Sequence, residues 1–207
     1  MLFGPQSGFL VHVHTHLCTA LLYMQRALPR RVVLFLSLLC EARAMRLVLQ
    51  RVTSASVAVD NQIVSKIGKG VLALVGLHKD DSAADLEYCA KKLCAAKLWE
   101  NSDGKAWRRS ARQDCLDVLL VSQFTLYGDV KNKKHVPDFK HSMKSAAALE
   151  QYEAFKKLVA SEYGDERKIH DGVFGAMMDV SLVNDGPVTL VVDSPPRPSV
   201  PAAEDLE

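Results

Sequence analysis

The spacing of apolar and polar residues predicts several short strands and two helices. The continuous apolar run from Val71 to Leu77 is typical of a strand that is covered on both faces, and Cys115 to Val121 is expected to form another buried strand. Apolar residues recur at helical spacing over 83–98 and 146–163. Further strands are expected at 46–59, where a strand pair opens, and at 63–67, 177–183 and 188–192.

Strands outnumber helices in this pattern, which predicts an α/β protein. Two helices must then cover a sheet that is mixed or largely antiparallel. Residues 128–145 are polar and basic and are expected to form a loop. Asp185-Gly186 lies between two apolar strands, and a plain hairpin turn is the default interpretation of that dipeptide. Periodicity alone does not select one topology.

The two ends of the chain differ from its body. Residues 1–44 are apolar and carry several arginines but a single acidic residue, which suits a transit segment or an unused upstream start before Met45. Their apolar run from Val32 to Cys40 is too short to span a bilayer. Residues 195–207 are rich in proline and are expected to be disordered. The sequence therefore predicts one domain over 45–194.

Charge and cysteine content narrow the range of functions. The chain carries 26 lysines and arginines against 24 acidic residues, and the excess lies in residues 1–44. A nearly neutral body argues against a broad surface that coats nucleic acid. Five cysteines without a C-x-x-C pair indicate neither a disulfide framework nor a zinc site. A reducing compartment is therefore expected, with no metal and no cofactor.

Polar residues follow the second buried strand, at Ser122, Gln123 and Thr125. A serine or threonine nucleophile needs a base within hydrogen-bond reach. No histidine lies beside these residues in the sequence, but His135, His141 or His170 could approach them in the fold. The other possibility is backbone chemistry, because free N–H groups of Gln123 and Phe124 at a strand end can stabilise an oxyanion. A plain capped strand end is the third interpretation.

The segments S-Q-F-T (122–125) and N-D-G-P-V-T (184–189) together resemble the two signature motifs of the D-aminoacyl-tRNA deacylases. The resemblance extends from Met45 to about Ser194. It implies a three-layer α/β/β homodimer that hydrolyses the ester of D-aminoacyl-tRNA and of mischarged glycyl-tRNA. Main-chain groups of the first motif would hold the ester while the 2′-hydroxyl of the tRNA assists. The catalytic residues implied are Ser122, Gln123, Phe124 and Thr125.

The resemblance also assigns a role to the second motif. Gly186–Pro187 is expected to form a cis bond whose carbonyls reach into the pocket of the partner subunit and hold the α-amino group. Arg51 is expected to brace this loop, and Phe174 to stack on the terminal adenine of the tRNA. The substrate-binding residues implied are Asn184, Gly186, Pro187, Thr189, Arg51, Phe174 and Met178.

Five lysines follow the first motif closely, at Lys131, Lys133, Lys134, Lys140 and Lys144. Such runs are usually solvated loops, but this one is placed to meet phosphates of the tRNA acceptor stem. The expected partners are therefore tRNA and a second copy of the chain, with no membrane. The expected location is the cytoplasm, or the mitochondrion if residues 1–44 are a transit segment.

Three alternatives remain open. A related editing enzyme removes L-amino acids from tRNA and uses a trans Gly–Pro bond, so the isomer at Gly186–Pro187 bears on the choice. A non-catalytic module would bind tRNA without cleaving the ester. A serine hydrolase would acylate Ser122 or Thr125.

Overall fold

The computed structural model describes residues 45–131 and 133–195. The expectations for 1–44, and for all but the first residue of 195–207, therefore lie outside the described residues. None of the helices in the described part is long and apolar enough to cross a membrane. The elements follow in the order β1 (Arg46–Val59), β2 (Gln62–Ile67), β3 (Gly70–Gly76), α3 (Ala83–Ala95), β4 (Lys97–Trp99), β5 (Arg109–Ser110), β6 (Asp117–Ser122), η1 (Phe124–Tyr127), α4 (Ser145–Tyr163), η2 (Glu166–Lys168), β7 (Ile169–Asp171) and β8 (Asp179–Asp193).

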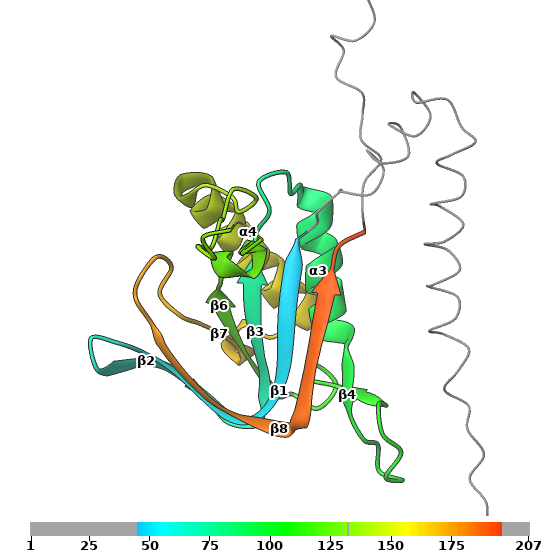
Figure 1. The fold of residues 1–207 in the computed structure, drawn as a ribbon. Helices are drawn as coiled ribbons and strands as arrows, with labels where there is room; N and C mark the ends of the chain where they lie inside the picture. Colours follow the sequence, from blue (N-terminus) through cyan, green and yellow to red (C-terminus); the bar gives the residue numbers. More distant parts are fainter. Residues whose placement is uncertain (1–44, 132, 196–207) are drawn as a thin grey trace, which may run out of the picture. The chain divides into compact units, whose positions relative to one another are not determined.

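One mixed sheet organises the fold (Figure 1). Its strand order is β2-β1-β3-β6-β7, and β8 pairs with β1. β1 runs antiparallel to β2, β3 and β8, whereas β3, β6 and β7 run parallel to one another. All residues of β3 except Leu74 are buried, and so are the residues of β6 between Asp117 and Ser122, as predicted for these two strands.

The long strand β1 creates the third layer. Its first half pairs with β3, and its second half, from Ala55 to Val59, pairs with β2. β8 follows β1 along both halves. Figure 1 shows β2 and the neighbouring parts of β1 and β8 bending away from β3 and β6. This half of the sheet can therefore cover the face that the helices leave open.

Two apolar cores hold the layers together. On one face of the sheet, Ala73 and Leu120 pack with residues of α3 and α4, including Phe155. On the other face, Leu72 packs with Ile67 of the bent strands. Leu72 and Ala73 fall in different cores because successive residues of a strand point to opposite faces. Full burial of each leucine or phenylalanine stabilises the fold by roughly 1.5–3 kcal/mol. The three layers confirm the α/β/β prediction.

Helix α3 is shorter than the helical spacing predicts. It ends at Ala95, and its C-cap residue Ala96 has a ψ of 119°, which is outside the helical region. Leu98 instead lies in β4, which pairs with β5. Leu98 is only 2% exposed. The apolar pattern therefore predicted correctly that Leu98 is buried, but it placed the residue in a helix rather than in a strand.

The predicted hairpin at Asp185-Gly186 is wrong. β8 continues from Asp179 to Asp193, and its two parts both pair with β1. β1 is a single strand of 14 residues rather than the opening of a strand pair. It is long enough to pair with both parts of β8, so pairing with β1 replaces pairing across a local turn.

Candidate active site

The S-Q-F-T motif begins where β6 ends. Ser122 pairs with Val75 of β3, and the amide of Gln123 donates to the carbonyl of Val75 at 2.8 Å. The expectation of a free N–H at Gln123 is therefore wrong, because the strand pairing extends one residue past β6. The amides of Phe124 and Thr125 lie in the first turn of η1. Their N–H groups therefore have no acceptor within η1.

Side chains around η1 fix its position. Nε2 of Gln123 donates to Oγ1 of Thr125. The ring of Phe124 is 57% exposed and meets Phe139 edge to face, with the centroids 5.1 Å apart. Oγ of Ser142 donates to the carbonyl of Phe124 at 2.9 Å. The chain between η1 and α4 therefore lies directly beside the motif, a contact for which the sequence carries no local signal.

We call residues 128–144 the lysine-rich loop. Two ion pairs within it, Lys131 with Asp129 at 3.5 Å and Lys140 with Asp138 at 3.8 Å, are long and involve exposed lysines, so they contribute little to stability. The lysines outnumber these two carboxylates, so the loop is positively charged. Its predicted tRNA-binding lysines are all exposed, at Lys131, Lys133, Lys134, Lys140 and Lys144.

Phe174 lies at the same edge of the sheet as the first motif. β6 and β7 are parallel, with Leu120 opposite Asp171, so the segments that follow both strands leave the sheet at its carboxyl edge. The amide of Gly172 donates to the carbonyl of Leu120 at 3.0 Å, which extends this pairing towards Phe174. Met178 lies nearby in the chain and accepts a hydrogen bond through Sδ from the amide of Val173 at 3.3 Å.

The second motif forms a bulge in β8. Gln50 pairs with Thr189 and Val52 with Asn184, so the residues between Asn184 and Thr189 have too few partners on β1 and leave the sheet. Nδ2 of Asn184 donates to the carbonyls of Arg51 at 2.8 Å and Val188 at 3.0 Å. Oδ1 of Asn184 accepts from the hydroxyl of Thr189 at 3.2 Å. The carboxamide of Asn184 thus closes the bulge.

Arg51 links the bulge to β4. Its Nε lies 3.0 Å from a carboxylate oxygen of Asp185, and its Nη1 donates to the carbonyl of Leu98. Gly186 has a φ of 85°, a conformation that residues with a Cβ rarely adopt. Its amide bond to Pro187 is trans, since the described residues contain no cis peptide bond. The expected cis bond is therefore not present in this single chain, where trans is the lower-energy isomer of an X–Pro bond.

The bulge and the first motif lie apart within one chain. Arg51 pairs with Val71 near the start of β3, whereas Ser122 pairs with Val75 near its end. Four residues of a strand correspond to about 13 Å. In addition, β1 and β3 lie between β8 and β6. One chain thus joins the first motif with Phe174 and the lysine-rich loop, but not with Gly186–Pro187.

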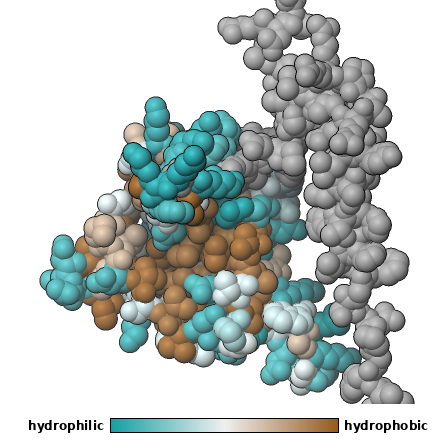
Figure 2. Space-filling view, in the orientation of Figure 1, coloured by the Kyte–Doolittle hydropathy of each residue, from teal (hydrophilic) through white to brown (hydrophobic). Residues whose placement is uncertain are grey.

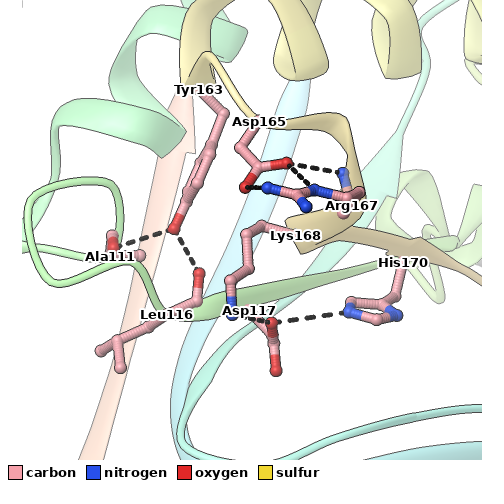
Figure 3. Close-up of polar contacts among 8 residues, drawn as sticks. All are labelled: Ala111, Leu116, Asp117, Tyr163, Asp165, Arg167, Lys168 and His170. Carbon is pink, nitrogen blue, oxygen red and sulfur yellow. Dashed lines mark hydrogen bonds and ion pairs between the residues drawn. The ribbon is translucent and has the colours of Figure 1, made fainter.

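A polar cluster occupies the opposite end of β6 (Figure 3). Nζ of Lys168 lies 3.1 Å from Oδ1 of Asp117, and Nε2 of His170 lies 3.6 Å from the same oxygen. His170 pairs with Leu119, three residues or about 10 Å before Ser122, and its imidazole is directed further away, at Asp117 at the start of β6. His170 is therefore no base for Ser122. Within 45–131 and 133–195, no group of three or more His, Cys, Asp or Glu side chains is arranged to hold a metal ion.

Comparison with known proteins identifies the family of this chain. The sequence model of the family described as D-Tyr-tRNA(Tyr) deacylase matches residues 48–193. A protein of Opitutus terrae named D-aminoacyl-tRNA deacylase is 48% identical over 153 residues, which are 74% of this chain and 99% of that protein. The protein of the same name from Saccharomyces cerevisiae is 43% identical over 72% of this chain and 99% of its own length.

Solved structures resemble this fold as well. The c-Myc DNA unwinding element binding protein superposes with a TM-score of 0.69 and is 37% identical, over 72% of this chain and 99% of its own. A probable eukaryotic D-amino acid tRNA deacylase superposes with a TM-score of 0.62 over the same shares, and at 20% identity the likeness concerns the fold alone. The family match spans the first motif, the bulge and, apart from the first two residues of β1, every strand of the main sheet, so this chain belongs to the D-Tyr-tRNA(Tyr) deacylase family.

Proposed function

We propose that this protein hydrolyses the ester that joins a D-amino acid, or mischarged glycine, to tRNA. The observation that carries the proposal is the carboxyl edge of the sheet, where η1, Phe174 and the lysine-rich loop lie together. The amides of η1 can donate to the ester carbonyl of an aminoacyl-tRNA, the ring of Phe174 can stack on a base, and the lysines can bind phosphates. Family membership supplies the substrate class.

Main-chain groups carry the chemistry in this proposal. The amides of Phe124 and Thr125 donate to the carbonyl oxygen of the ester, whose negative charge grows as the tetrahedral intermediate forms. The terminal 2′-hydroxyl of the tRNA assists, so no side chain has to be acylated. The bond from Gln123 to Thr125 keeps the first turn of η1 in position. No metal or cofactor is required.

We propose further that the protein acts as a homodimer in which the bulge serves the partner's site. The separation between the bulge and the first motif within one chain supports this arrangement. Apolar residues of β8 are also exposed, with Val183 at 57% and Val191 at 61%. Figure 2, which has the orientation of Figure 1, shows an apolar area across the middle of the visible face, and such areas are typical of protein interfaces.

The bulge would provide chiral selection. Carbonyls of Gly186–Pro187 hold the α-amino group while the amides of η1 hold the ester carbonyl. With both groups fixed, the side chain of a D-residue points outwards, whereas that of an L-residue collides with the bulge. Steric rejection does not depend on the kind of D-side chain, and glycine enters because it has no side chain to collide.

Two other candidate functions are each favoured by one observation. The trans bond at Gly186–Pro187 is the isomer that the related L-amino acid editing enzyme uses. A wider pocket of that kind would accept small L-residues as well. One structural neighbour is named as a DNA-binding protein, which favours a nucleic-acid-binding role without ester cleavage. The first candidate predicts cleavage of both the D-ester and the L-ester, and the second predicts cleavage of neither.

The test compares two matched esters. The full chain is incubated with D-tyrosyl-tRNA or L-tyrosyl-tRNA in the presence of a chelator, and the loss of each ester is followed with time. Fast loss of the D-ester alone is expected. Loss of both esters would favour the relaxed editing enzyme or a general esterase. Loss of neither, with tRNA binding that weakens as salt rises, would favour the non-catalytic module.

The lysine-rich loop is proposed to meet the acceptor stem of the tRNA. Each lysine that contacts a phosphate should reduce the slope of log affinity against log salt when it is replaced by a neutral residue. The cytoplasm is the proposed compartment, because aminoacyl-tRNA is the substrate.

A further inference from the structure

Phe174 lies in a short turn that is closed by one backbone hydrogen bond, from the amide of Ala176 to the carbonyl of Val173 at 3.2 Å. It lies between β7 and β8, with Gly172 and Gly175 on either side, and Gly175 has a φ of 77°. Glycine lets a chain adopt many conformations, so the ring needs side-chain contacts to hold one orientation. The ring of Phe174 packs on that of Tyr152 in α4, with centroids 5.5 Å apart and planes inclined by 45°.

Tyr152 is also bonded to the strand that leads to Phe174. Tyr152 is 1% exposed, and its hydroxyl donates to Oδ1 of Asp171 at 2.6 Å. Nζ of Lys156, one turn further along α4, donates to Oδ2 of Asp171 at 2.9 Å. Burial raises the pKa of the Tyr152 phenol, so the hydroxyl stays protonated and can only act as the donor towards this carboxylate. Both oxygens of Asp171 are thus held by α4.

The other side of the same strand is fixed as well. Side chains of β7 alternate between the two faces of the sheet, so Asp171 points to α4 while His170 points away from it. Figure 3 shows His170 and Lys168 both directed at Asp117 of β6. β7 is therefore fastened on both faces directly before Phe174.

We infer that Tyr152 and Asp171 are positioning residues that set the orientation of the Phe174 ring for the terminal base of the tRNA. The inference rests on the proposed function. Tyr152 acts through two contacts at once, its hydroxyl on Asp171 and its ring on Phe174. Removing only the hydroxyl loosens the strand and lets the Phe174 ring turn. Binding of the tRNA end weakens in consequence, whereas the amides that act on the ester remain in place.

The test is a double-mutant cycle on the full chain, with D-tyrosyl-tRNA as substrate. Tyr152→Phe is expected to raise KM about tenfold and to change kcat less than about twofold, since the lost hydrogen bond is to a charged group. In a Phe174→Ala background the same substitution should have no further effect on KM. Asp171→Asn should raise KM in the same way, because it removes the charge that Lys156 meets. It provides a second route if Tyr152→Phe folds poorly.

Tyr163→Phe is the matched control. Tyr163 lies in the same helix, and its buried hydroxyl donates to the carbonyls of Ala111 and Leu116 (Figure 3). Leu116 directly precedes β6, whereas Phe174 lies at the carboxyl edge of that strand. This variant should lose stability but keep the wild-type KM. An unchanged KM in folded Tyr152→Phe, or an equal rise with Phe174 already removed, would overturn the inference. Absence of cleavage by the wild-type protein would instead overturn the proposed function itself.

Discussion

Replacing Gly186 by alanine tests the structure of the bulge. The conformation at Gly186, with φ at 85°, costs a residue with a Cβ about 1–2 kcal/mol. The added Cβ would also lie 2.6 Å from Nη2 of Arg51, which is closer than such atoms approach. Arg51 cannot move away freely because it is bonded to Asp185 and to the carbonyl of Leu98. Loss of a hydrogen bond to a charged group costs about 1.5–3 kcal/mol, and less where water can reach it.

These effects together destabilise Gly186→Ala by about 2–4 kcal/mol. For a domain of this size the melting temperature should fall by roughly 5–15 °C. Cleavage of D-tyrosyl-tRNA should be largely lost even well below the melting temperature of the variant, where the variant is still folded, because the displaced Arg51 no longer supports the bulge. Thermal unfolding followed by circular dichroism and the deacylation assay measure the two effects separately.

Gly164→Ala is the matched control for backbone strain. Gly164 also has a φ of 85°, but nothing lies within 4 Å of the position that its Cβ would take. It ends α4, so the substitution adds the cost of the left-handed conformation without a collision. Its melting temperature should fall by only about 2–8 °C, with deacylation intact. Equal stability of the two variants, together with full activity of Gly186→Ala, would refute the reasoning.

Three further outcomes are expected. Thr125→Ala should lower kcat by about tenfold, which corresponds to the free energy of one hydrogen bond. Mass spectrometry of quenched reactions should find no acylated protein. Complete loss of activity would instead support a threonine nucleophile. Asn184→Ala should destabilise the protein by about 1–3 kcal/mol, because two carbonyls of the bulge lose their donor, and unchanged chemical unfolding would argue against that role. Burial raises the pKa of the Cys89 thiol to about 12, so iodoacetamide at pH 8 should modify exposed Cys115 in the native protein and reach Cys89 only after unfolding.

The buried elements could be predicted because their signal is local. Helix α4 was expected at 146–163 and runs over Ser145–Tyr163. The apolar run of β3 was recognised because a strand covered on both faces has no polar alternation. The bulge was not predicted, since Asp-Gly favours a hairpin wherever only local pairing is considered. The competing partner, β1, lies more than a hundred residues earlier in the chain.

The parts of the candidate site were visible in the sequence, but their grouping was not. Phe174 and the first motif meet because β6 and β7 pair in parallel, and such pairing of distant segments leaves no periodic mark. The contact of Ser142 with Phe124 is of the same kind. The bond between Tyr152 and Asp171 was missed because a buried tyrosine at helical spacing looks like any core residue.

The distance between the two motifs makes a second subunit necessary to the proposed mechanism, and this can be tested by complementation. Gly186→Ala damages the bulge, whereas Phe174→Ala damages the carboxyl edge, so each variant alone should be nearly inactive at substrate concentrations well below KM. If the bulge of one subunit serves the site of the other, a mixed dimer contains one site with both parts intact. Equal amounts of the two variants, unfolded and refolded together, form mixed dimers at random and should recover about one quarter of the wild-type activity. If both parts act within one chain, no mixture can contain an intact site, and the refolded sample would remain as inactive as its components.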